Sequence, residues 1–103
     1  MKVKIPFKES FREPMVNGVK TWTSRTRRLG KAGDTFIAFG CEFEILKVER
    51  RILQDVFDYH WREEGCEDPI DFFEVWEKIH PVKGFVPSQR VYVHIFKRVG
   101  ESP

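Results

Sequence analysis

The sequence lacks any long hydrophobic run. No stretch approaches the ~18–20 apolar residues that a membrane-spanning helix needs. The first six residues carry charge without an apolar run or a small-residue cleavage site, a pattern that argues against a signal peptide. We therefore expect a soluble protein of the cytoplasm, with no partner in a membrane.

Cysteine is scarce, with only Cys41 and Cys66 in the chain. Neither belongs to a CxxC pair, and His60, His80 and His94 lack the spacing of metal ligands. The sequence therefore predicts neither a metal nor a cofactor. In a reducing compartment the two thiols are small buried side chains, whereas an extreme thermophile would allow a single disulfide.

Charge is unevenly distributed along the 103 residues, whose net charge is only +2. Residues 1–31 hold nine basic residues against two acidic ones, and residues 54–77 hold nine acidic residues against one basic residue. Such polarity is typical of two solvated faces of opposite sign. A basic face also attracts polyanions, which favours a nucleic-acid partner.

The length leaves room for one domain, 1–103, with one core. Apolar spacing and turn residues predict helices and strands in mixed order. A small curled sheet or barrel of about five strands with flanking helices, of α+β class, fits that order best. The predicted elements are helices over 11–17, 54–64 and 69–79, and strands over 20–25, 35–39, 42–53 and 90–98.

Three details of the predicted strands concern the sheet. Gly40-Cys41 suits a two-residue hairpin turn with glycine in the first central position. The apolar phase of strand 42–53 slips between Ile45 and Leu46, which predicts a bulge. Strand 90–98 is apolar on both faces, which predicts a central position in the sheet.

The segment Gly18–Arg25 combines one amine, one guanidinium and three hydroxyl groups. If it is extended, Thr21, Thr23 and Arg25 project to one face, and Lys20 leans over that face from beside the glycine. Such groups suit an anionic or carbonyl-bearing ligand. The alternative is a solvated edge strand whose cations prevent aggregation.

Further candidate positions lie on both sides of this segment. Arg27 and Arg28 suit a rim that contacts phosphates, and Trp22 could stack on a base. Glu64 is predicted at a helix C-terminus, where the helix dipole disfavours a negative charge unless a cation such as Lys20 pairs with it.

Taken in order, these residues resemble the ASCH (activating signal cointegrator homology) domain over nearly the whole chain. The most specific element is Gly18-x-Lys20-x-x-Thr23-x-Arg25. The other matching positions are Thr21, Gly33-Asp34, Arg62-Glu63-Glu64-Gly65, Pro69, Phe72, Trp76 and the strand 91–96.

The resemblance implies a PUA-like fold, a small mixed β-barrel with helices at its side, and an association with RNA. One bacterial branch of the family hydrolyses the amide of N4-acetylcytidine with a Lys, a Thr and a Glu, which fall on Lys20, Thr23 and Glu64. Gly18, Thr21, Trp22, Arg25, Arg27 and Arg28 would then contact the nucleoside or RNA.

Three functions follow as expectations for a chain that we expect to be monomeric. The first is binding of RNA or a modified nucleoside in a cleft built on Lys20, Thr23, Arg25 and Glu64. The second is hydrolysis of N4-acylated cytidine at the same residues. The third is a protein-interaction module that uses the acidic surface of residues 54–77.

Overall fold

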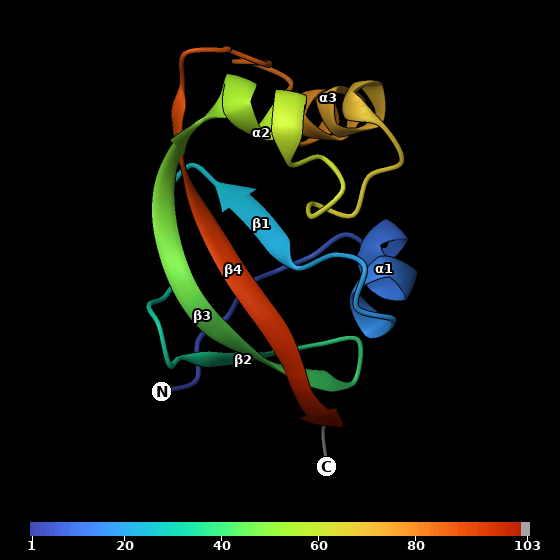
Figure 1. Ribbon diagram of the computed structural model, residues 1–103, viewed down its shortest axis with the longest axis vertical. Helices are drawn as coiled ribbons and strands as arrows, with labels where there is room; N and C mark the ends of the chain where they lie inside the picture. The colour runs from blue at the N-terminus through green and yellow to red at the C-terminus, as the bar shows by residue number, and fades with distance from the viewer. Residues whose placement is uncertain (102–103) are drawn as a thin grey trace.

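A computed structural model of the chain describes residues 1–101. Four strands form one sheet in the order β1-β4-β3-β2, and every neighbouring pair is antiparallel. Short helical segments and two longer helices flank the sheet (Figure 1). The elements are η1 (Glu9–Phe11), α1 (Arg12–Val16), β1 (Trp22–Arg25), β2 (Thr35–Ala38), β3 (Cys41–Ile52), α2 (Leu53–Tyr59), α3 (Pro69–Ile79) and β4 (Arg90–Glu101).

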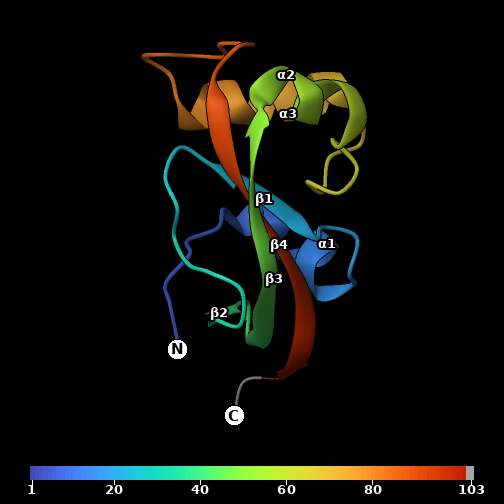
Figure 2. The same cartoon turned by 60° about the vertical axis from the view of Figure 1, so that its left-hand side comes forward.

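The sheet is a curled half-barrel built on the long strands β3 and β4 (Figures 1 and 2). β4 lies between β1 and β3, which confirms its predicted central position. The register of β3 shifts between Ile45 and Lys47, so Leu46 is the bulged residue that the sequence predicted. Bulges bend a strand and increase its twist, which accounts for the curl. The chain is therefore α+β, as expected.

The hairpin between β2 and β3 differs from its prediction by one residue. Ala38 pairs with Cys41, so Phe39 and Gly40 are the central residues of the turn. Both have positive φ, 54° and 75°, which is the signature of a type I′ turn. The prediction of Gly40-Cys41 was wrong because Cys41 is a buried strand residue that packs in the core.

The N-terminal segment contributes one parallel bridge, from Lys2 to Thr35, in place of a fifth strand. The predicted helix 11–17 is divided into η1 and α1. No helix within residues 1–101 is long and apolar enough to cross a membrane.

Two clusters of buried side chains fill the two ends of the molecule. One includes Met15, Phe36 and Phe96 at the end near β2. The other lies under α2 and α3 and includes Trp22 and Leu53. Cys41 and Cys66 belong to different clusters and form no disulfide with each other.

Candidate functional site

Backbone hydrogen bonds fix the entry to β1 on both sides. Gly18, at φ 76°, ends α1, and the N–H groups of Val19 and Lys20 both donate to the carbonyl of Pro14 at 2.8 Å. The N–H groups of Thr21 and Trp22 then donate to the carbonyl of Glu63 at 2.8 and 2.9 Å. The start of β1 is therefore bound to the turn that follows α2, although 40 residues separate them.

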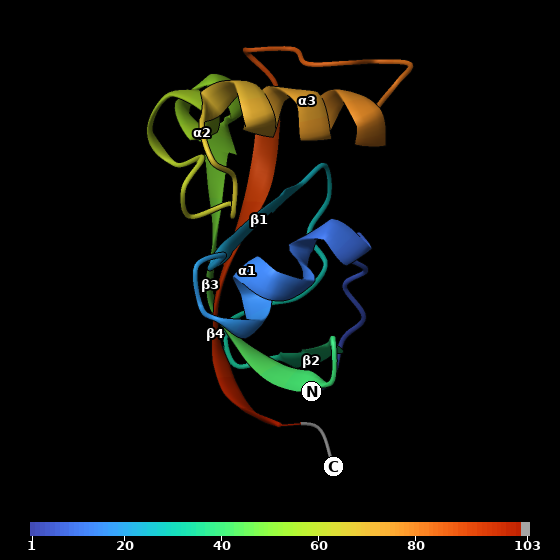
Figure 3. The same cartoon turned by 90° about the vertical axis from the view of Figure 1, so that its right-hand side faces the viewer.

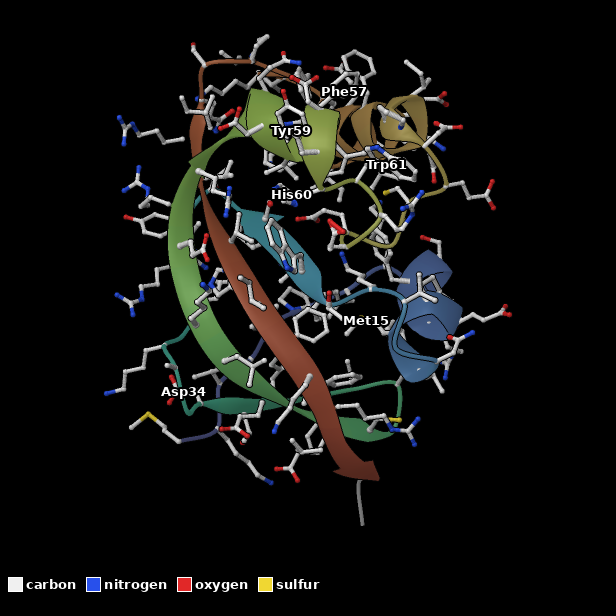
Figure 4. All side chains as sticks on the ribbon, in the orientation of Figure 1. Met15, Asp34, Phe57, Tyr59, His60 and Trp61 are labelled. Carbon is white, nitrogen blue, oxygen red and sulfur yellow. The ribbon has the colours of Figure 1, made fainter. Side chains whose placement is uncertain are left out.

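This turn replaces the last part of the predicted helix 54–64. α2 ends at Tyr59, and His60 follows directly after it (Figure 4). The ring of His60 stacks on Trp22 with 4.2 Å between centroids. The prediction of the helix end was wrong because an apolar spacing of three and four residues fits these turns as well as a helix. Glu64 therefore lies in a turn and not at a helix terminus.

Gly65 allows this turn to approach β1 closely. Its φ is +88°, and a Cβ at this position would lie 2.8 Å from the Cβ of Lys20. Glycine is thus required for two reasons, the backbone conformation and the lack of space. The close approach places Glu64 directly beside Lys20.

Lys20 and Glu64 form a buried ion pair, with side chains only 2% and 6% exposed and 3.5 Å between Nζ and Oε1. Lys20 Nζ also donates to the carbonyls of Trp22 at 2.8 Å and Glu64 at 2.7 Å. The ring of Phe11 lies 4.3 Å from the ammonium nitrogen. Burial lowers the pKa of Lys20, while the charge of Glu64 acts in the opposite direction.

The residues of β1 complete a polar network around this pair. Ser24 Oγ donates to Glu64 Oε2 at 2.7 Å. Arg25 Nε donates to Thr23 Oγ1 at 2.9 Å, and another nitrogen of the same guanidinium donates to the carbonyl of Pro6. Thr23 accepts from Arg25, so its own hydroxyl proton stays available for another acceptor.

These side chains share one cavity of about 480 Å³. β1 and the turn at Glu64 provide its polar wall, the segment 4–11 provides Phe7 and Phe11, and α3 provides Phe72 and Trp76. Figure 3 shows β1 between α3 and α1. A volume of this order, with mostly apolar walls and a few convergent polar groups, is typical of a small-molecule site.

His94 supports the cavity from behind. It is fully buried on β4, and its Nε2 accepts from the N–H of Leu29 at 2.9 Å. Its Nδ1 must therefore carry the proton, and it donates to the carbonyl of Thr23 at 3.2 Å. Because Thr23 and Leu29 both line the cavity, the neutral imidazole links two parts of its wall.

The structure brings together five of the nine predicted residues. Lys20, Thr23, Arg25, Arg27 and Glu64 line the cavity. Gly18, Thr21 and Arg28 lie outside the cavity lining. Thr21 precedes β1, which begins at Trp22.

Trp22 is also outside the cavity, contrary to our expectation that it could stack on a base. It is 9% exposed and packs in the cluster beneath α2 and α3. Its ring lies between His60 and the guanidinium of Arg51, 5.2 Å away. Trp22 therefore stabilises the position of the turn.

Several cavity residues were not predicted as site residues. Ser24 was counted among the hydroxyl groups of its segment but was not recognised as a partner of Glu64. Phe72 and Trp76 match positions of the family pattern but were not predicted to line a site, and no prediction concerned Phe7 or Phe11. No local pattern in the sequence indicates that these rings come together. In the structure the guanidinium carbon of Arg25 lies 5.0 Å from the centre of the Phe7 ring.

The cavity offers no obvious metal ligands. Within residues 1–101, no three His, Cys, Asp or Glu side chains lie together as a metal site requires. Cys66 lines the cavity, but burial raises the pKa of its thiol to about 12. A thiol in that state is a weak nucleophile and a weak metal ligand.

The sequence matches no protein-family model and no curated protein. Three crystal structures are similar to the chain in fold. An ASCH domain from Lactobacillus crispatus JV V101 is 14% identical, with a TM-score of 0.65, and the match covers 97% of this chain and 79% of that one. Hypothetical protein PH0355 is 14% identical, with a TM-score of 0.70 and coverage of 96% and 100%.

The third is protein EF3133 from Enterococcus faecalis V583, of the family DUF984. It is 19% identical, with a TM-score of 0.63, and the match covers 89% of this chain and 71% of that one. Identities this low establish the fold alone. The chain therefore has the fold of an ASCH domain, as its sequence predicted.

Proposed function

We propose that the cavity binds a pyrimidine nucleoside unit, either modified or as part of RNA. The observation that supports this proposal is the meeting of Lys20, Thr23, Arg25 and Glu64 in one cavity of about 480 Å³. A base would lie against the aromatic wall. The carboxylate of Glu64 would accept from an exocyclic amine, as acidic side chains do from N4 of cytosine.

Binding is tested by titration calorimetry with cytidine and N4-acetylcytidine. Thr23→Val preserves the shape of the side chain but removes its hydroxyl, and Glu64→Gln removes the charge. Each variant should weaken binding by about ten-fold or more, because a hydrogen bond to a charged group contributes about that much to affinity. Glu74→Gln is the matched control, because Glu74 is exposed on α3 and is not part of the cavity.

Equal affinity in all four proteins would contradict the proposal. Because Glu64→Gln leaves Lys20 without its ion-pair partner, the fold of each variant is checked first by circular dichroism. Absence of measurable binding by the wild type would instead favour a protein-interaction module that uses the acidic surface of residues 54–77.

Hydrolysis of N4-acylcytidine is the second candidate, and the buried Lys20–Glu64 pair favours it. Transfer of a proton from Lys20 to Glu64 would leave a neutral amine as the base and a carboxyl group as the proton donor, and burial lowers the pKa of Lys20. Thr23 Oγ1 would attack the amide carbonyl while Lys20 accepts its proton. Glu64 would then protonate the departing N4 amine, leaving an acyl ester on Thr23 that water hydrolyses.

This candidate is tested by incubating the protein with N4-acetylcytidine and measuring released cytidine and acetate by chromatography. Thr23→Ala and Lys20→Ala should each abolish nearly all turnover, since groups that act as a unit do not contribute additively. Glu64→Gln should reduce the rate ~10²–10⁴-fold. Wild-type turnover no faster than that of Thr23→Ala leaves only the binding function.

A further inference from the structure

A row of side chains continues from the cavity across the sheet. Arg25 on β1 pairs with Tyr92 on β4, and Tyr92 pairs with Arg50 on β3. Paired residues of antiparallel strands project to the same face, with Cβ atoms about 5 Å apart. Arg25 lines the cavity, so the row begins at its wall and ends about 10 Å away, two strand spacings further.

Tyr92 and Arg50 contact each other at the far end of this row. The guanidinium carbon of Arg50 lies 4.2 Å from the centre of the Tyr92 ring, and its Nη1 donates to the tyrosine hydroxyl at 2.9 Å. Arg50 is exposed and Tyr92 is half-buried. The pair thus combines an exposed guanidinium with an aromatic ring, and both are groups on which unpaired bases stack in RNA complexes.

The face that carries this row bears more uncompensated positive charge than the opposite face. The strand pairs place Arg25, Arg50 and Arg90 on the same side as Tyr92, together with the apolar side chains of Val48 and Ile52. On the opposite side, Glu49 forms ion pairs with Lys47 and Arg51 and offsets one of their two charges. Charge complementarity therefore favours a polyanion on the first face.

We infer that the row Arg25–Tyr92–Arg50 is a second nucleotide subsite and that the natural ligand is a single strand of RNA. The inference rests on the proposed function, since it assigns one nucleotide to the cavity. The neighbouring base stacks on the Tyr92–Arg50 pair. The phosphate between the two nucleotides lies near Arg25, which spans the two subsites.

The experiment compares two ligands, cytidine 5′-monophosphate by calorimetry and fluorescein-labelled pentacytidine RNA by fluorescence anisotropy. The wild-type protein should bind the pentamer about ten-fold or more tightly than the monophosphate, because a second base stacks. Tyr92→Ala and Arg50→Ala should each remove most of this gain while leaving the affinity for the monophosphate unchanged.

Two controls separate stacking from charge. Lys47→Ala removes a cation from the opposite face and should leave both affinities unchanged. Arg50→Lys keeps the charge without the planar group, so it should lose about as much pentamer affinity as Arg50→Ala if stacking is the cause.

The outcomes separate the two proposals. Equal wild-type affinity for both ligands, or equal binding of an RNA duplex of the same length, overturns the second subsite and leaves the cavity function standing. Absence of binding to either ligand overturns both. Binding of the pentamer that depends on Lys47 as much as on Arg50 shows general attraction to the protein and also overturns the subsite.

Discussion

At the scale of single residues, the cavity depends on hydrogen bonds between groups distant in sequence. The segment around Lys20 and Thr23 was identifiable because its residue types and spacing are unusual and because they resemble a known family. Ser24 was not identifiable as a partner of Glu64, because the two residues are 40 positions apart and no local pattern encodes that contact. The same holds for the aromatic wall, whose rings come from the segment 4–11 and from α3.

His94 should make stability depend on pH. Burial lowers the pKa of His94, and the nearby cations Arg25 and Arg28 act in the same direction. The folded pKa thus lies below the unfolded value of about 6.5, and the unfolded state binds more protons between the two. This contribution is fully present above pH 6.5 and is lost as the pH falls toward the folded pKa.

The measurement is urea unfolding of the wild type and His94→Gln between pH 5 and 7.5. The variant should be about 1–3 kcal/mol less stable at pH 7.5, because the carbonyl of Thr23 loses its buried donor. Its stability should also fall less steeply toward pH 5. If His60→Gln, on the half-exposed turn, flattens the pH dependence as much, the assignment to His94 is wrong.

At the scale of elements, most of the sheet could be predicted and the ends of the helices could not. Alternating apolar residues identified β2, β3 and β4, and the phase slip at Ile45 identified the bulge, because both patterns follow from which face is buried. The end of α2 depends on a contact between His60 and Trp22, which is a tertiary interaction.

The turn at Gly65 should be far more sensitive to substitution than the turn at Gly18. Both residues have positive φ, but a Cβ at Gly18 meets nothing within 4 Å, whereas one at Gly65 meets Lys20. Gly18→Ala should cost about 1–2 kcal/mol from backbone strain alone. Gly65→Ala should cost more, and it should also weaken nucleoside binding because Lys20 and Glu64 move apart.

Thermal unfolding and calorimetric titration of the two variants provide the comparison. The two substitutions are chemically identical, so any difference between them reports the space beside Lys20. Equal loss of stability with unchanged binding in both would show that the close approach of the turn is not needed for the site.

At the scale of the whole molecule, the uneven charge of the sequence should appear in the salt dependence of RNA affinity. Each phosphate contact with single-stranded RNA contributes about −0.7 to the slope of log affinity against log salt. The double variant Arg27→Ala/Arg28→Ala should therefore have a slope shallower by up to about 1.4. Glu74→Ala, on the acidic side, should leave the slope unchanged or raise the affinity.

The slopes are measured by fluorescence anisotropy with labelled pentacytidine RNA at about 50–300 mM salt. Over roughly this range the screening length of the solution stays close to the distances between surface charges. An identical slope in the wild type and the arginine double variant would show that Arg27 and Arg28 do not contact the RNA. A slope near zero in the wild type would contradict nucleic-acid binding by this face altogether.

The outer edges of β1 and β2 are partly covered by other segments of the chain, which limits self-association through these strands. β1 and β2 have only four residues each, and their neighbours already occupy part of each outer edge: the carbonyl of Glu63 on β1 and the bridge from Lys2 on β2. Little backbone is left on which another copy could polymerise by strand addition. The turn that brings Glu64 to Lys20 therefore also covers part of an edge on which fibres could grow. Variants that loosen this turn, such as Gly65→Ala, should form larger aggregates on storage, measured by light scattering, whereas Gly18→Ala should scatter light as the wild type does.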